Sequence, residues 1–229
     1  MTTRTDPGLR VALFLFLTAL AGPGAAQTAP SLVEIAAYEG LHRAAADGDA
    51  EAIRDLAAGG ADLNARDNAG RTPVHVATFA GQPQALRALA EAGADMNALD
   101  GEAYDAVTIA AVADDPDLLS LALALGNRPD LVTSRWDGTA LIAAAHLGHD
   151  EVVRRLIAAG APLDHVNNLG WTALIEAVVL GDGGPRHQAT VQALVEAGAD
   201  RNLADRDGQT PLMLAEARGY ARIAALLGG

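Results

Sequence analysis

The sequence predicts an all-α solenoid of about six helix-turn-helix repeats joined by hairpin loops. Glycines that end Ala- and Leu-rich segments recur at intervals of 33, 33, 34 and 38 residues: Gly60, Gly93, Gly126, Gly160 and Gly198. Residues suited to starting a helix keep nearly the same period: Thr72, Asp105, Thr139, Thr172 and Thr210. Such a period is typical of stacked repeats, in which no single repeat buries its own apolar face.

Composition agrees with a scaffold built from small side chains. Half of the 229 residues are apolar but only 3% are aromatic, so the core is expected to consist of Ala, Leu, Val and Ile. The net charge of −13 repels phosphate backbones, which argues against nucleic-acid binding. The chain has no cysteine, which excludes disulfides, thiol nucleophiles and thiolate metal sites.

Residues 1–26 have the pattern of a secretory signal peptide. Arg4 and Arg10 lead into the apolar run 11–20, which is followed by small and helix-breaking residues up to Ala26. The run of about ten residues is too short to span a bilayer, so we expect cleavage after Ala26 rather than a membrane anchor. Export to a bacterial periplasm is the expected destination, with secretion beyond the cell as the alternative. Residues 27–38 form a lead-in segment.

The second repeat shows the pattern most clearly. It reads Asn-Ala-Gly-Arg-Thr-Pro-Val-His-Val-Ala over residues 68–77 and continues into a helix that ends at Gly93. Thr72 is expected to cap the first helix, with Pro73 at its first position, where a missing N–H costs nothing. Gly93 supplies a left-handed C-terminal cap. This segment resembles the ankyrin consensus, including its Thr-Pro-x-His opening, and the resemblance covers residues 39–229.

The ankyrin resemblance divides the domain 39–229 into approximate repeats of 39–67, 68–100, 101–134, 135–167, 168–205 and 206–229. Its motifs are strong in all but the third repeat, which lacks Thr-Pro at Asp105. The fifth repeat carries about five extra residues between its helices, in a loop near 182–188. The last repeat ends in the apolar run 223–227, which is expected to pack inward as the C-terminal cap.

The resemblance implies a non-catalytic module that binds a protein partner through hairpin tips and the concave face lined by the first helices. The hairpin position just before the capping residue of the first helix holds large side chains. Trp136 lies near this position in the fourth repeat, in a hairpin expected to be one residue shorter. Carried over to this chain, the predicted partner-binding residues are Arg71, Phe79, Tyr104, Trp136, His146, Leu147, Trp171 and Leu180. Aromatic residues on exposed edges are typical of binding hot spots. The alternatives are that each ring packs on the next hairpin, and that helix rotation buries the side chains at the ends of the first helices between repeats, Val112 and Val179 among them.

The histidines indicate structure rather than chemistry. His42 and His75 occupy the consensus histidine position, where a hydrogen bond between repeats is the ordinary role. His146 and His149 are three residues apart, but Gly148 is expected to end the helix between them and no third ligand is near, so we expect no metal site. The sequence indicates no cofactor.

The inserted loop is the only other candidate for chemistry. Asp182, Arg186 and His187 form a conceivable acid–base or small-ligand cluster, although Gly- and Pro-rich loops more often simply bridge two helices. No phosphate-binding loop or nucleophile motif occurs. We therefore expect no enzyme, but a monomeric interaction module that contacts no membrane after cleavage. A secreted effector that binds a host protein, and a catalytic or ligand-binding role of loop 182–188, remain alternatives.

Overall fold

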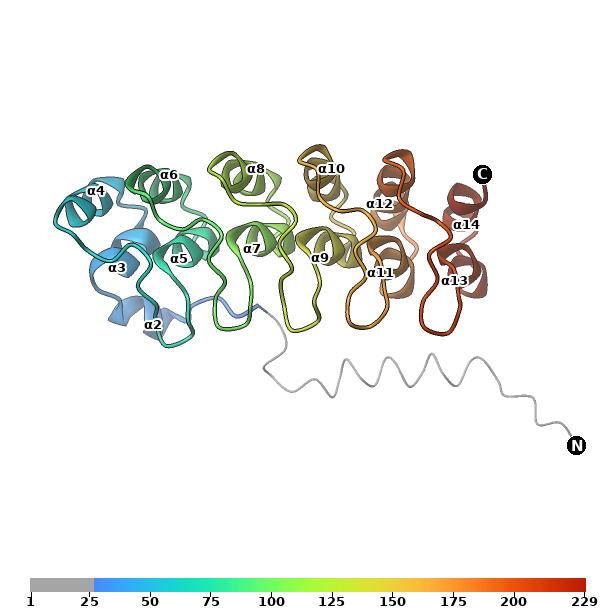
Figure 1. The fold of residues 1–229 in the computed structure, drawn as a ribbon, viewed down its shortest axis with the longest axis horizontal. Coiled ribbons are helices and arrows are strands. Elements are labelled where there is room, and N and C mark those ends of the chain that lie inside the picture. Colours follow the sequence, from blue (N-terminus) through green and yellow to red (C-terminus); the bar gives the residue numbers. More distant parts are fainter. Residues whose placement is uncertain (1–26) are drawn as a thin grey trace, which may run out of the picture.

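The computed structural model describes residues 27–229, and the predicted signal peptide, residues 1–26, lies outside them. Helices form two layers along one axis (Figure 1). The inner layer holds the first helix of each repeat: α3 (Gly40–Asp47), α5 (Pro73–Phe79), α7 (Ala106–Val112), α9 (Ala140–Leu147), α11 (Ala173–Val179) and α13 (Pro211–Ala217). The outer layer holds the second: α4 (Ala50–Ala58), α6 (Pro83–Ala92), α8 (Pro116–Ala124), α10 (Asp150–Ala158), α12 (Pro185–Glu196) and α14 (Ala221–Gly228). The predicted all-α repeat solenoid is confirmed.

The inner helices begin at the residues that set the sequence period. Asp105 Oδ1 accepts a hydrogen bond from Thr108 N at 2.8 Å, and threonine hydroxyls cap α9, α11 and α13 in the same way. In α5 the cap differs, because the Thr72 N–H donates to Nδ1 of His75 at 3.0 Å. At the other end of the repeat, Gly93 adopts a left-handed φ of 96°.

The core depends on alanines at one position of the inner helices. Five of them are fully buried and recur with the repeat period: Ala77, Ala110, Ala144, Ala177 and Ala215. A methyl group at this position lets neighbouring inner helices approach closely, while leucines such as Leu86 and Leu119 fill the space toward the outer layer. This arrangement explains a large core with few aromatic residues.

Successive hairpins are joined by backbone hydrogen bonds. The bonds run from Gly101 N to Ala69 O (2.9 Å), Ser134 N to Ala103 O (2.8 Å) and Asn168 N to Trp136 O (2.9 Å). The hairpin that bears Trp136 is longer by one residue than its neighbours, so the expectation of a shorter turn was wrong. Ser134 and Asp137 adopt positive φ there to accommodate the extra residue.

The lead-in segment contains a short helix that the sequence did not predict, α2 (Leu32–Ala37), which lies beside the first hairpins (Figure 1). Ser31 and Glu34 form a capping box at its start. Glu34 also pairs with Arg71, whose guanidinium donates to Thr28 O at 3.2 Å. The lead-in thus covers the first hairpin, which contains Arg71. Among residues 27–229, none of the helices combines the length and hydropathy needed to cross a bilayer.

Candidate protein-binding surface

Two of the predicted partner-binding residues are buried, which corrects their assignment to exposed tips. Arg71 is only 1% exposed, because its guanidinium pairs with Asp67 at 2.7 Å and with Glu34 of the lead-in. Trp171 is 8% exposed and belongs to the hydrophobic core. The Trp171 ring packs within the solenoid, as the alternative for the aromatic residues expected.

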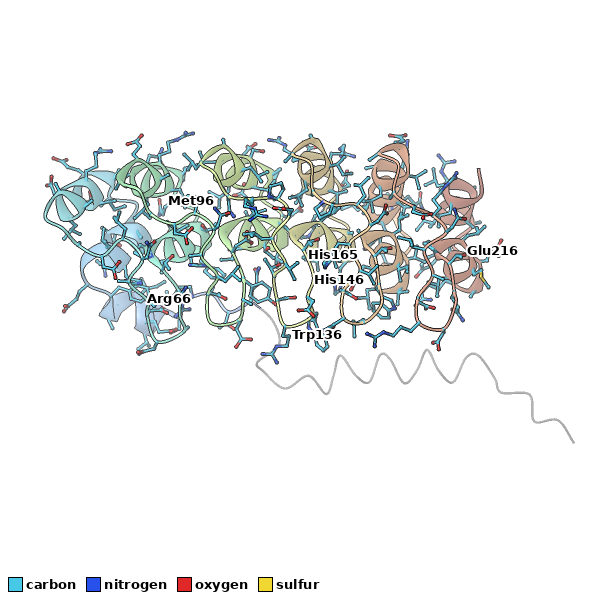
Figure 2. All side chains as sticks on the ribbon, viewed as in Figure 1. Arg66, Met96, Trp136, His146, His165 and Glu216 are labelled. Atoms are coloured by element: carbon cyan, nitrogen blue, oxygen red, sulfur yellow. The ribbon has the colours of Figure 1, made fainter. Side chains whose placement is uncertain are left out.

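The other predicted residues reach solvent to different degrees. Trp136 is 43% exposed and lies near the ends of the hairpins, whereas His146 lies on inner helix α9 (Figure 2). Leu147 is 40% exposed at the end of α9. Three predicted residues are half-buried: Phe79, Tyr104 and Leu180. Val112 and Val179, whose burial was the alternative, are also half-buried.

Three exposed large apolar residues of the repeats were not predicted from the sequence: Val132, Val166 and Met213. The two valines occupy equivalent hairpin positions 34 residues apart, a spacing that could have found them. Met213 stands at the consensus histidine position of the last repeat and is 52% exposed. In the first three repeats the residue at this position forms a hydrogen bond with the next hairpin, whereas no further hairpin follows α13 in the described chain.

The exposed large apolar side chains of the repeats all lie on the same two kinds of element. We call Val132, Trp136 and Val166 the hairpin row, and we define the inner-helix face by the C-terminal ends of the inner helices: Phe79, Val112, His146, Leu147, Val179 and Leu180. Within residues 39–229, no large apolar side chain is exposed on an outer helix. Large exposed apolar side chains gathered on one side indicate an interaction surface.

A buried carboxylate lies beneath the inner-helix face. Glu176 of α11 is 4% exposed, and its Oε1 accepts a hydrogen bond from Asn167 Nδ2 at 2.9 Å. Its Oε2 has no hydrogen-bond partner among the described residues, and Nδ1 of His146 stands 3.6 Å away, beyond a normal hydrogen bond. Burial raises the pKa of Glu176 to about 7.

The consensus histidines link repeats, as predicted. His42 Nε2 donates to Arg71 O at 2.9 Å, and His75 Nε2 donates to Tyr104 O at 3.0 Å. Burial lowers the pKa of His75, in keeping with a neutral ring whose Nδ1 accepts from Thr72. Gly148 ends α9 in a left-handed conformation, and His149 Nδ1 donates to Ala111 O at 2.8 Å. The described chain holds no cluster of three or more potential metal ligands.

The inserted loop is shorter than predicted, because α12 begins at Pro185 and its first turn includes Arg186 and His187. Arg186 pairs with Asp114 of the third repeat at 2.8 Å and with Asp150 of the fourth at 3.3 Å. His187 is almost buried, with Nδ1 2.8 Å from Asp182 and Nε2 3.0 Å from His146 O. The inserted residues therefore connect three repeats.

This arrangement of stacked helix pairs, capping threonines and hydrogen-bonded hairpins defines an ankyrin repeat protein. The family model described as ankyrin repeats (3 copies) matches residues 16–104 and 107–205, and the chain belongs to the ankyrin repeat family. Ankyrin repeats generally mediate protein–protein interactions, and the fold is typically a non-catalytic module.

Two relatives of bacterial origin cover most of this chain. The ankyrin repeat protein YahD of Escherichia coli (strain K12) is 39% identical over 186 residues, which are 80% of this chain and 92% of YahD. The crystal structure of an ankyrin repeat domain from Acinetobacter baumannii AYE is 46% identical, with a TM-score of 0.77 over 82% of this chain and 95% of that one.

A third likeness is to the crystal structure of EF0377, an ankyrin repeat protein. It is 32% identical to this chain, and the TM-score is 0.76 over 83% of this chain and 98% of that one. These likenesses cover 80–83% of this chain and at least 92% of each relative, so they support the same repeat architecture over most of the chain.

Proposed function

We propose that this chain is a non-catalytic interaction module that binds a folded protein partner on the inner-helix face and the adjoining hairpin row. The observation that carries the proposal is the distribution of exposed large apolar side chains in the repeats. They occur on hairpins and inner helices, and the outer helices of the described repeats expose none. A partner that covers Leu147 and Trp136 removes this apolar surface from water.

The binding residues differ from those expected from sequence. Leu147 and Trp136 are the exposed anchors, and Phe79, Tyr104 and Leu180 extend the surface as half-buried side chains. Arg71 and Trp171 support the hairpins from within. The acidic chain, with a net charge of −13, favours a partner with basic groups around its apolar contact.

Paired surface variants test this proposal. A Leu147→Ser/Trp136→Ser variant is expected to keep the wild-type circular dichroism spectrum and melting temperature and to lose the protein that co-purifies with wild type. Glu91→Ser/Arg154→Ser on the exposed outer helices is the matched control and is expected to retain that protein. Equal recovery by both variants would place the binding surface elsewhere.

We also propose export, with cleavage after Ala26, on the basis of the charged, apolar and small-residue segments of residues 1–26. The mature N-terminus is then Gln27, which intact-mass spectrometry of the natively produced protein measures. Release of the protein when the outer membrane is opened supports a periplasmic location. Recovery from the medium supports the effector alternative, and recovery of an uncleaved chain in the cytoplasm contradicts export.

The alternative role of residues 182–188 in catalysis or small-ligand binding has less support. Arg186 already pairs with two aspartates, and His187 is held between Asp182 and the backbone of His146. These contacts favour a clamp between repeats. A functional role separable from folding would appear as lost activity in cells with unchanged stability when Arg186 is replaced by Met.

A further inference from the structure

Glu176 is a buried acid at a position where the second, third, fourth and sixth repeats have apolar or small residues. The equivalent residues of α5, α7, α9 and α13 are Val76, Ile109, Ala143 and Leu214. Burying a carboxylate costs free energy unless its oxygens find partners. An apolar side chain at this position would be the stabilising choice, so the acid calls for an explanation other than packing.

The hairpin before α11 departs from the repeat pattern in step with Glu176. Three other hairpins have an aspartate whose Oδ1 accepts two backbone N–H groups of the turn: Asp67, Asp100 and Asp205. Asn167 makes the same two bonds through its Oδ1 and uses its amide group to donate to Glu176. The amide replaces a carboxylate that would repel Glu176, and it holds Oε1 in place.

The second oxygen of Glu176 is left without a donor. Asn167 occupies Oε1, while Oε2 is buried and accepts no hydrogen bond in the described chain. The side chain of His146 lies beside this oxygen, with Nδ1 3.6 Å from Oε2, and it is 47% exposed on the inner-helix face.

We propose that Glu176 Oε2, reached beside the His146 ring, receives a basic side chain of the protein partner, either a lysine ammonium or an arginine guanidinium. This inference rests on the proposed function and names the partner chemistry at one point of the inner-helix face. Cations supply the hydrogen-bond donors that Oε2 lacks and neutralise a buried charge. The strongly acidic chain attracts such a group from solution.

Apolar side chains beside this point suit the stem of a basic residue. Leu147 follows His146 at the end of α9, and Val179 lies three residues after Glu176 on α11, which places it on the same side of the helix. Lysine and arginine side chains bury their methylene groups along apolar surface while their charged ends reach a polar partner.

Small cations that mimic the two side chains provide the test. Wild type carrying ¹³C-labelled glutamate and ¹⁵N-labelled histidine is titrated at pH 8 with n-butylguanidinium, n-butylammonium and the neutral n-butylurea. We expect saturable shifts of the Glu176 carboxyl and His146 ring signals with one or both cations and none with the urea. The cation that binds more tightly identifies arginine or lysine. Shifts of equal size with the urea, or no saturable shift with either cation, would overturn the proposal.

Glu176→Gln is the isosteric variant, and Glu216→Gln, at an exposed residue of α13, is the matched control. Glu176→Gln is expected to weaken cation binding at least tenfold, as measured from the His146 ring signals. Glu216→Gln is expected to leave cation binding unchanged. Unchanged binding by Glu176→Gln refutes the site. The proposed function is measured separately by partner recovery with the Leu147→Ser/Trp136→Ser variant, so either idea can fail without the other.

Discussion

Asn167 donates a hydrogen bond to the buried carboxylate of Glu176 across 2.9 Å, and so joins a hairpin to the helix that follows it. The hairpins before α5, α7 and α13 have aspartate at this position and an apolar residue in place of Glu176. The two differences occur together in the fifth repeat. They indicate that the amide and the acid form one local arrangement.

Asn167→Asp is therefore expected to destabilise the fold, although aspartate is the common residue in the other hairpins. Two carboxylates would face each other in a buried site, and at pH 8 the expected loss is on the order of 3 kcal/mol in the free energy of unfolding. Urea denaturation measures this loss. Adding Glu176→Leu places an aspartate and a leucine at these two positions, as Asp205 and Leu214 are placed in the last repeat, and is expected to restore stability. A double variant as unstable as Asn167→Asp would contradict this explanation.

The pKa of about 7 for Glu176 predicts how stability depends on pH. The folded state holds a proton that the unfolded chain releases near pH 4.5, so Glu176 lowers stability as pH rises from about 4.5 through 7. The loss is on the order of 3 kcal/mol and is complete above the folded-state pKa. Glu176→Gln removes this contribution. Its stability relative to wild type should increase over that pH range and level off above it, whereas a pH-independent difference would contradict the shifted pKa.

The contacts of Arg71 are expected to hold the lead-in segment against the repeats. Arg71→Met removes the buried partner of Asp67 and the contact with Glu34, and is expected to cost about 3 kcal/mol. Hydrogen exchange in residues 32–37 should also accelerate. Arg43→Met, which breaks an exposed pair with Asp47, is the control and is expected to cost at most about 0.5 kcal/mol. Equal losses in the two variants would show that burial of Arg71 adds nothing.

The insertion in the fifth repeat is expected to act on stability. His187→Ala removes hydrogen bonds to Asp182 and to the His146 carbonyl, and should lower the free energy of unfolding by about 1–2 kcal/mol. Arg186→Met breaks half-exposed ion pairs and should cost less than about 1 kcal/mol. Thermal and urea unfolding compare the two. Wild-type stability of His187→Ala would contradict the view of the insertion as a clamp.

Much of the fold could be predicted because each repeat contains its own signals. Threonine and aspartate caps, glycine ends and recurring alanines are local features, and their period identifies the stacking before any coordinates. The roles of His42 and His75 followed from the same pattern. The lead-in helix was missed because its contact with Arg71 joins residues 37 apart and has no counterpart in the repeats.

The site was less predictable because exposure depends on what the neighbouring repeat contributes. Arg71 and Trp171 share a hairpin position with the half-buried Tyr104, and only the packing of each hairpin separates them. Glu176 went unnoticed because an isolated acid on a helix looks like a solvent-exposed residue. Comparison with Val76 and Ile109 in the repeat alignment was the signal that could have revealed it.

Site-specific photocrosslinking tests most directly whether a partner covers the inner-helix face. A benzoylphenylalanine placed at position 147 on α9 is compared, in cells that make the protein, with one at exposed position 158 on outer helix α10 of the same repeat. We predict one discrete protein adduct from position 147 and none from position 158. An adduct from position 158 alone, or none from position 147, would contradict the proposed binding surface.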